Sequence, residues 1–160
     1  DLAKAIGIDT KLSLLTGLEI QSTVEGDNLE TQAVAKPESL TKEVYEQIVK
    51  TALLHEMLGQ ELTDWSAGNF INNDGQIKLV DLGGTQTITD QSASAERLAQ
   101  ISNIGESFHC AGDDTSKKAK LKQQVTDLHQ EITGDTQTMQ RLMGEVIATL
   151  DENRIGYDAG

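Results

Sequence analysis

Residues 64–84, DWSAGNFINNDGQIKLVDLGG, constrain the fold more than any other stretch of this sequence. Two short apolar runs flank Asp74-Gly75, and this pattern predicts a β-hairpin because Asp-Gly is favoured in two-residue hairpin turns. A two-stranded ribbon returns the chain to the end at which it started. The polar residues before the first run and after the second are therefore expected to lie near one another.

Helical periodicity appears on both sides of this hairpin. A helix is predicted over residues 40–58, about five turns, with Ser39 or Thr41 as its cap and Gly59 placed to stop it. Three further helical stripes follow the hairpin, separated by a loop over residues 105–115 and by the Gly134-Asp135 break. The apolar residues that define the four stripes are Leu40, Val44, Ile48 and Ala52; Ala95, Leu98, Ile101 and Ile104; Leu121, Val125, Leu128 and Ile132; and Met139, Leu142, Met143, Val146, Ile147 and Leu150.

The remaining segments complete an α+β domain that is mainly α-helical. Residues 12–24 carry apolar side chains largely at period two, which predicts one or two short strands. Residues 26–28 are typical of a turn, and residues 60–68 read as a polar loop. We expect one domain over residues 1–150 and a polar tail, 151–160, that frays.

Composition narrows the class of protein. The formal net charge of −13 disfavours nucleic acid and anionic membrane as partners, because negatively charged phosphates are bound by lysine and arginine. It suits a basic protein partner, with plain solubility as the simpler interpretation. Cys110 is the only cysteine, which fits a reducing compartment such as the cytoplasm, and no apolar run is long enough to span a membrane. The sequence starts at Asp1 without methionine, as a piece of a longer protein would.

Three motifs resemble the C-terminal lobe of the protein-kinase-like fold, over about residues 12–84. DWSAGN resembles the catalytic loop, in which an Asp precedes an Asn by five positions, as Asp64 precedes Asn69. IKLVDLG resembles the strand that leads into the metal-binding Asp-Phe-Gly loop, with Asp81 as its acidic residue. LEIQSTVEGDNL, residues 18–29, looks like the last strand of the N-terminal lobe and the hinge.

This resemblance implies Mg-ATP-dependent phosphoryl transfer to a hydroxyl acceptor. Asn69 and Asp81 would each supply one oxygen to Mg²⁺, which takes hard oxygen ligands. Asp64 would orient the acceptor hydroxyl or accept its proton. The alternative interpretation of all three residues is that they are turn and cap residues, since Asn and Asp are common in loops.

The sequence also departs from the kinase pattern. The usual His-Arg before the catalytic Asp is replaced by Leu62-Thr63, and Ser66 stands where protein kinases carry a lysine. No Gly-rich phosphate loop precedes residue 64. AVAK, residues 33–36, looks like the strand that carries an ATP-binding lysine, but it follows the expected hinge, so Lys36 is rejected for that role.

Two functional hypotheses follow. The first is a kinase-like phosphotransferase that resembles compact bacterial effector kinases, located in the cytoplasm or in the cytosol of a host. The second is a non-catalytic, acidic helical module that binds a protein partner through a helix face. A response to nucleotide and Mg²⁺ distinguishes the two.

Overall fold

The computed structural model describes residues 27–73, 75–80 and 85–158, with the backbone alone at 85 and 152–158. Helices dominate, and the strands form two small antiparallel sheets. The α+β class predicted from the sequence is thereby confirmed. The elements in chain order are β1 (Asp27–Asn28), α3 (Leu29–Ala35), 3-10 helix η1 (Pro37–Ser39), α4 (Lys42–Met57), β2 (Gln60–Leu62), 3-10 helix η2 (Ala67–Asn69), β3 (Phe70–Asn73), β4 (Gln76–Leu79), β5 (Thr85–Thr87), 3-10 helix η3 (Gln91–Ala93), α5 (Ser94–Ala99), 3-10 helices η4 (Gln100–Glu106) and η5 (His109–Ala111), α6 (Thr115–Thr133) and α7 (Thr136–Asp158).

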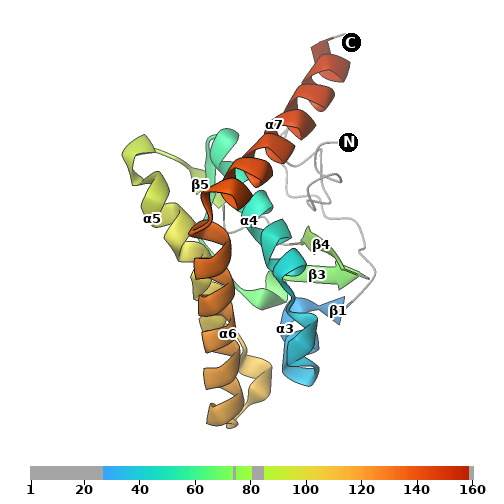
Figure 1. Ribbon diagram of the computed structural model, residues 1–160, viewed down its shortest axis with the longest axis vertical. Helices are drawn as coiled ribbons and strands as arrows, with labels where there is room; N and C mark the ends of the chain where they lie inside the picture. Colours follow the sequence, from blue (N-terminus) through green and yellow to red (C-terminus); the bar gives the residue numbers. More distant parts are fainter. Residues whose placement is uncertain (1–26, 74, 81–84, 159–160) are drawn as a thin grey trace.

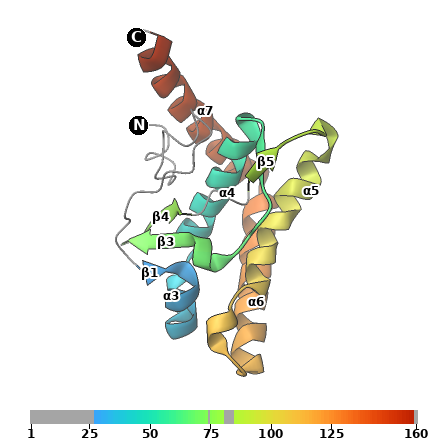
Figure 2. The ribbon, with the colours of Figure 1, turned by 180° about the vertical axis from the view of Figure 1, so that it is seen from behind.

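Helix α4 lies at the centre of the molecule. Figures 1 and 2 show the sheet β1-β3-β4 on one side of it and the helices α5 and α6 on the other. Helix α7 crosses α4 and projects beyond the body toward the C-terminus (Figure 1). Residues from every turn of α4 are therefore buried, namely Val44, Tyr45, Ile48, Val49, Thr51, Leu53, Leu54 and His55.

Both ends of α4 follow the local signals in the sequence. Thr41 is the N-cap, and its hydroxyl accepts a hydrogen bond from the Val44 amide at 3.2 Å. Gly59 follows the C-cap residue Leu58 with φ of 75°, a left-handed conformation that glycine adopts without the clash of a Cβ atom. The predicted helix 40–58 is confirmed, with its ends shortened to Lys42–Met57.

The predicted hairpin is present. Strands β3 and β4 pair in antiparallel register, with Phe70 opposite Leu79 and Asn73 opposite Gln76. Gly75 takes φ of 88° in the two-residue connection, and Asp74 lies outside the described residues. Helix α4 holds this hairpin through Gln47, whose side-chain amide donates to the Gly75 carbonyl and whose Oε1 accepts from the Ile77 amide at 2.9 Å.

The predicted polar loop 60–68 is wrong at both of its ends. Residues 60–62 form β2, which pairs antiparallel with β5, and residues 67–69 form η2. The same pairing makes residues 85–87 the strand β5. Neither strand shows alternation of apolar and polar residues, because each is three residues long and is defined by its partner across the sheet.

The predicted turn over residues 26–28 is also wrong where the structure describes it. Asp27 and Asn28 pair with β3 as β1. Asn28 is then the N-cap of α3, with Oδ1 accepting from the Thr31 amide at 2.8 Å. The segment read as an upstream hinge therefore leads into a short helix, and Lys36 is the C-cap of that helix. The strands predicted over residues 12–24 lie outside the described residues.

The second half of the chain is helical, as predicted, but its first helix ends early. Helix α5 passes into η4, so part of the predicted loop 105–115 is 3-10 helix. A Cβ built on Gly105 would lie 3.4 Å from the Lys122 backbone and the Val125 side chain, and this close approach of η4 to α6 suits glycine. Helix α7 continues through the predicted polar tail to Asp158, since residues such as Glu152 and Arg154 favour helix.

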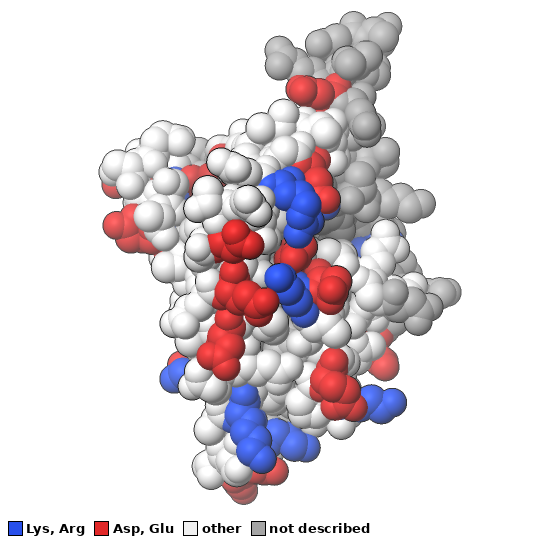
Figure 3. All heavy atoms as spheres, viewed as in Figure 1, with Lys and Arg blue, Asp and Glu red and all other residues white. Residues whose placement is uncertain are grey.

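Ion pairs join α4 to the last two helices. Lys42 lies 3.3 Å from Glu131 of α6, and Arg141 of α7 lies 2.6 Å from Glu46. Figure 3 shows basic side chains beside acidic ones across this helical face. Such exposed pairs each contribute about 0–1 kcal/mol, so they orient the helices more than they stabilise them. Within the described segments, no helix is long and apolar enough to cross a lipid bilayer.

Two glycines provide a matched test of the helical half. A Cβ at Gly134, between α6 and α7, would lie 2.5 Å from the Gln130 carbonyl oxygen, whereas at exposed Gly144 in α7 it would meet nothing within 4 Å. We expect Gly134→Ala to lower the free energy of unfolding by more than about 1 kcal/mol. Gly144→Ala should raise it by about 0.5–1 kcal/mol. Urea unfolding of both variants measures the difference, and an equal effect of the two would contradict the close contact at Gly134.

His55 makes the stability of the fold depend on pH. Its ring is 1% exposed, and neither ring nitrogen has a hydrogen-bond partner within the described part of the chain. Burial lowers the pKa of His55 from 6.5 to about 4. The unfolded chain therefore binds this proton more readily, and stability that is complete above pH 6.5 is lost as the pH falls toward 4.

The loss attributable to His55 between pH 7 and pH 4 is about 3 kcal/mol. We expect His55→Leu to reduce the difference in unfolding free energy between these two pH values by about this amount. Urea titrations at both pH values measure it, since contributions from carboxylates are common to both proteins. The same substitution at exposed His109 is the control. An unchanged pH dependence in His55→Leu would show that the imidazole is not buried uncharged.

Candidate functional site

Two strand pairings enclose the motif residues. Leu62 pairs with Thr85 in the sheet β2-β5, and Phe70 pairs with Leu79 in the hairpin β3-β4. Two segments therefore connect these pairings: one runs from Leu62 to Phe70 and the other from Leu79 to Thr85. The described ends of both segments are therefore held together in pairs, Leu62 with Thr85 and Phe70 with Leu79.

The loop between β2 and β3 places Asp64, Ser66 and Asn69 in direct contact. The Ser66 hydroxyl donates to Oδ1 of Asp64 at 2.6 Å, and the Asn69 amide Nδ2 donates to Oδ2 of Asp64 at 3.2 Å. Both carboxylate oxygens are thus oriented from within the loop. Since Asn69 turns its nitrogen toward Asp64, its Oδ1 remains available as an acceptor among the described residues.

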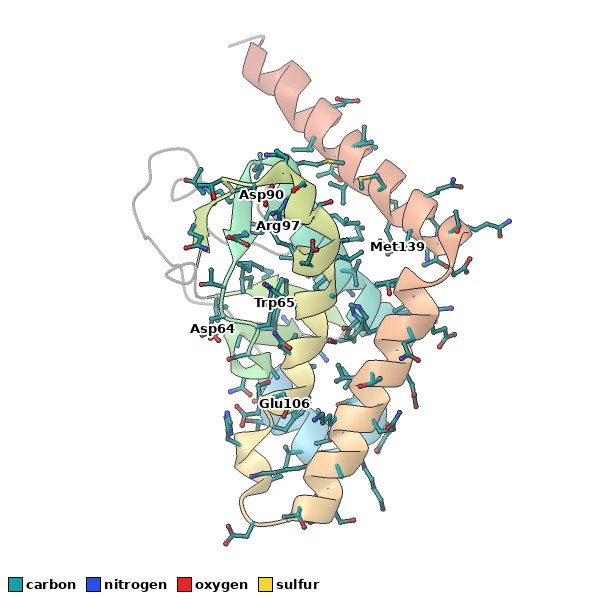
Figure 4. The ribbon with its side chains drawn as sticks, turned by 90° about the vertical axis from the view of Figure 1, so that its left-hand side faces the viewer. Asp64, Trp65, Asp90, Arg97, Glu106 and Met139 are labelled. Carbon is teal, nitrogen blue, oxygen red and sulfur yellow. The ribbon has the colours of Figure 1, made fainter. Side chains whose placement is uncertain are left out.

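Alternation of buried and exposed side chains explains why this loop presents its polar groups outward. Trp65 is 8% exposed and stacks on Phe70, with ring centroids 6.2 Å apart and planes inclined by 14°. Ala67 is completely buried, whereas Asp64 is exposed and Ser66 is half-buried. Figure 4 shows Asp64 at the outer edge of the molecule and Trp65 further in, beside the helix formed by α5 and η4. The apolar side chains anchor the loop, and the carboxylate faces solvent.

A residue from the helical half fixes the C-terminal end of the loop. The buried hydroxyl of Ser107 accepts a hydrogen bond from the Ala67 amide at 2.8 Å and donates to the Ile104 carbonyl at 2.6 Å. Asn69 then begins the hairpin, where its carbonyl accepts from the Val80 amide at 2.9 Å. The positions of Ala67 and Asn69 are therefore set from two different parts of the chain.

Asp81, the third residue predicted for the site, lies outside the described residues. Its preceding neighbour Val80 is the residue whose amide bonds to Asn69. The structure brings Asp64 and Asn69 into contact, whereas the predicted approach of Asn69 and Asp81 falls on a residue outside the description. The ligand role of Asp81 stays a prediction.

The chemistry of these donors fits a hard divalent cation. Mg²⁺ prefers carboxylate and amide oxygens and keeps several waters, and the loop provides one exposed carboxylate and one free amide oxygen. Over the described positions, no cluster of three or more His, Cys, Asp or Glu side chains is arranged to hold a metal ion. A site built on Asn69 would therefore need a further acidic ligand from residues outside that description.

Sequence reasoning missed two residues of this site. Ser66 was noted only as the replacement of a lysine, yet a serine two positions after an aspartate can bond to it locally, so the pattern was readable. Ser107 lies 40 residues from the amide that it holds, and no signal in the sequence connects the two.

Comparison with known proteins adds no relative: no family model matches this chain, and no curated protein or solved structure is significantly similar to it.

Ser107 provides the test of how the loop is held. We expect Ser107→Ala to lower the free energy of unfolding by about 1–3 kcal/mol, because the Ala67 amide loses its buried acceptor. Chemical denaturation measures this loss, and hydrogen exchange should show faster exchange of the Ala67 amide.

The matched control is Ser102→Ala. The Ser102 hydroxyl only donates to the Ala99 carbonyl at 2.8 Å in an exposed part of the chain, so its removal should change stability by less than about 0.5 kcal/mol. Equal effects of the two substitutions would contradict a specific role of Ser107.

Proposed function

We propose that this protein is a kinase-like phosphotransferase that uses Mg-ATP to phosphorylate a hydroxyl acceptor. The observation that carries the proposal is the contact between Asp64 and Asn69, whose side chains meet at 3.2 Å on an exposed loop. The five-residue spacing in DWSAGN is the resemblance to a kinase catalytic loop, and the geometry supports a shared role for these two side chains.

The second support is the double pairing around the loop. The β2-β5 pairing holds Leu62 next to Thr85, and the hairpin holds Phe70 next to Leu79. The loop between Leu62 and Phe70 is therefore fixed at both of its ends. Phosphoryl transfer depends mainly on positioning and on electrostatic stabilisation rather than on covalent chemistry by the protein. A loop held at both ends by strand pairing, by Trp65 and by Ser107 supplies that positioning.

In this proposal Asp64 orients the acceptor hydroxyl and accepts its proton. Its exposure gives an acceptor molecule access, and Ser66 and Asn69 fix the plane of its carboxylate. An orienting role needs a carboxylate within hydrogen-bond reach of the acceptor hydroxyl. Ser66 is a positioning residue, since it acts on Asp64 alone.

Asn69 and Asp81 would hold the magnesium ion. Asn69 contributes Oδ1, the oxygen left free by the bond from Nδ2 to Asp64. When bound, Mg²⁺ neutralises charge on the phosphate oxygens of the donor. No residue of this chain is assigned to the adenosine of ATP, and no Gly-rich loop precedes residue 64 to cover the phosphates.

Thermal unfolding of the full chain in the presence of ATP and Mg²⁺ tests the proposal. We expect the two together to raise the unfolding temperature by about 5–10 °C at a hundredfold excess over Kd, and either alone to have little effect. Asp81→Ala should abolish the increase, since it removes a metal ligand. Asp64→Asn should keep it but lower phosphoryl transfer by about 10²–10⁴-fold, measured by the formation of ADP from ATP.

The matched control is Asp113→Ala, an exposed aspartate outside the loop, which should leave both readouts unchanged. If neither nucleotide nor Mg²⁺ alters the unfolding temperature of the parent chain, the phosphotransferase proposal fails. The non-catalytic acidic interaction module is then the better interpretation.

A further inference from the structure

A cavity lies between α4, α5, α7 and the strand β2. Its volume is about 470 Å³, within the range of roughly 300–1,000 Å³ that is usual for small-molecule sites. Figure 4 shows Arg97 on α5, with Trp65 and Met139 labelled on opposite sides of that helix. Its main apolar lining residues are Leu53, Leu62, Trp65, Leu98, Met139 and Met143.

Several residues that line the cavity belong to the core but are not completely buried. Leu53 and Trp65 keep 8% of their surface exposed and Leu62 keeps 6%, although all three belong to the core cluster. Met139 and Met143, one turn apart on α7, are only partly buried against that cluster. Methionine is unbranched and adapts to different shapes, so this wall can accommodate an apolar ligand without rearrangement of the helices.

Three charged side chains lie at the same cavity. Arg97 donates through Nε to Glu56 Oε2 at 2.7 Å and through Nη2 to the other oxygen of that carboxylate. Its Nη1 donates to the Asp90 carbonyl at 2.7 Å. The guanidinium is thus committed to groups of the protein and is poorly placed to receive an anionic ligand.

Glu61 is the charge that remains. Its Oε1 accepts from the neutral Gln86 amide at 2.7 Å. Arg97 also interacts electrostatically with Glu61, but its guanidinium is hydrogen-bonded to Glu56. With Glu56 and Arg97 paired, the cavity carries one net negative charge, and the whole chain carries −13. Both the local and the overall charge attract cations.

We propose that this cavity binds a small amphipathic amine, with its apolar body against Trp65 and the two methionines and its ammonium group toward Glu61. The site is separate from the proposed phosphotransferase site, because Asp64 faces outward while Trp65 is directed inward from the same loop (Figure 4). Neither proposal depends on the other.

Trp65 is the only tryptophan in the sequence, so fluorescence excited where tyrosine does not absorb reports on the surroundings of this one side chain. The full chain is titrated with 4-phenylbutylamine, with neutral 4-phenylbutan-1-ol and with 4-phenylbutanoate, which share one apolar body and differ in charge. We expect saturable changes, with the amine bound about three- to fivefold more tightly than the alcohol. The carboxylate should bind most weakly.

Two variants locate the binding. Glu61→Gln should remove the preference for the amine over the alcohol while leaving the alcohol affinity unchanged. Ala95→Phe places a large side chain at an exposed position that lines the cavity, and it should weaken amine and alcohol alike by about tenfold. Ala99→Phe on the same helix, outside the lining, is the control and should bind as the parent does.

Three results would overturn the proposal. A parent chain that shows no saturable change with any probe has no ligand site at Trp65. Equal affinities for amine and alcohol would exclude recognition of the cation by Glu61. Unaltered binding in Ala95→Phe would show that the probes bind elsewhere.

Discussion

The structure depends on the burial of one helix. Helix α4 contacts α6 and α7, the strands β2 and β4, and α5 with its 3-10 extension η4. Its buried residues occupy most of its circumference. The Tyr45 hydroxyl also forms a hydrogen bond of 2.8 Å with Nδ1 of His129 on α6. Burial raises the pKa of Tyr45, so this phenol stays neutral. A helix buried on many sides fixes the relative positions of everything packed on it, because close-packed interiors tolerate little displacement.

The candidate site is one consequence of that arrangement. Gln47 holds the hairpin against α4, and β2 continues directly from the turn at Gly59. The loop between β2 and β3 is consequently attached to α4 at both ends, while Ser107 holds it from the other side. The exposed carboxylate of Asp64 therefore stands on a rigid support, which is what a catalytic or metal-binding group requires. The same support makes Trp65 a shared wall between this loop and the amine cavity.

Local patterns in the sequence predicted the elements with strong signals of their own. The Asp74-Gly75 hairpin and the Thr41 cap follow from short-range rules. The strands β2 and β5 and the bond from Ala67 to Ser107 carry no such signal, because each pairs residues distant in the chain. The apolar stripe on α4 could be predicted from the sequence, but the burial of the other sides of this helix could not. Periodicity indicates which residues avoid water and leaves open how many neighbours will cover them.

The sequence by itself determined the helical class, the hairpin and the chemical types gathered at residues 64–69. Those features follow from backbone preferences and from side-chain spacing, which act within a few residues. Only the tertiary structure decided that α4 is the central helix and that Arg97 forms an ion pair with Glu56. It also decided that a cavity remains beside Trp65. These outcomes depend on how helices distant in sequence pack, and packing depends on the shapes of all the surfaces that meet rather than on any one segment.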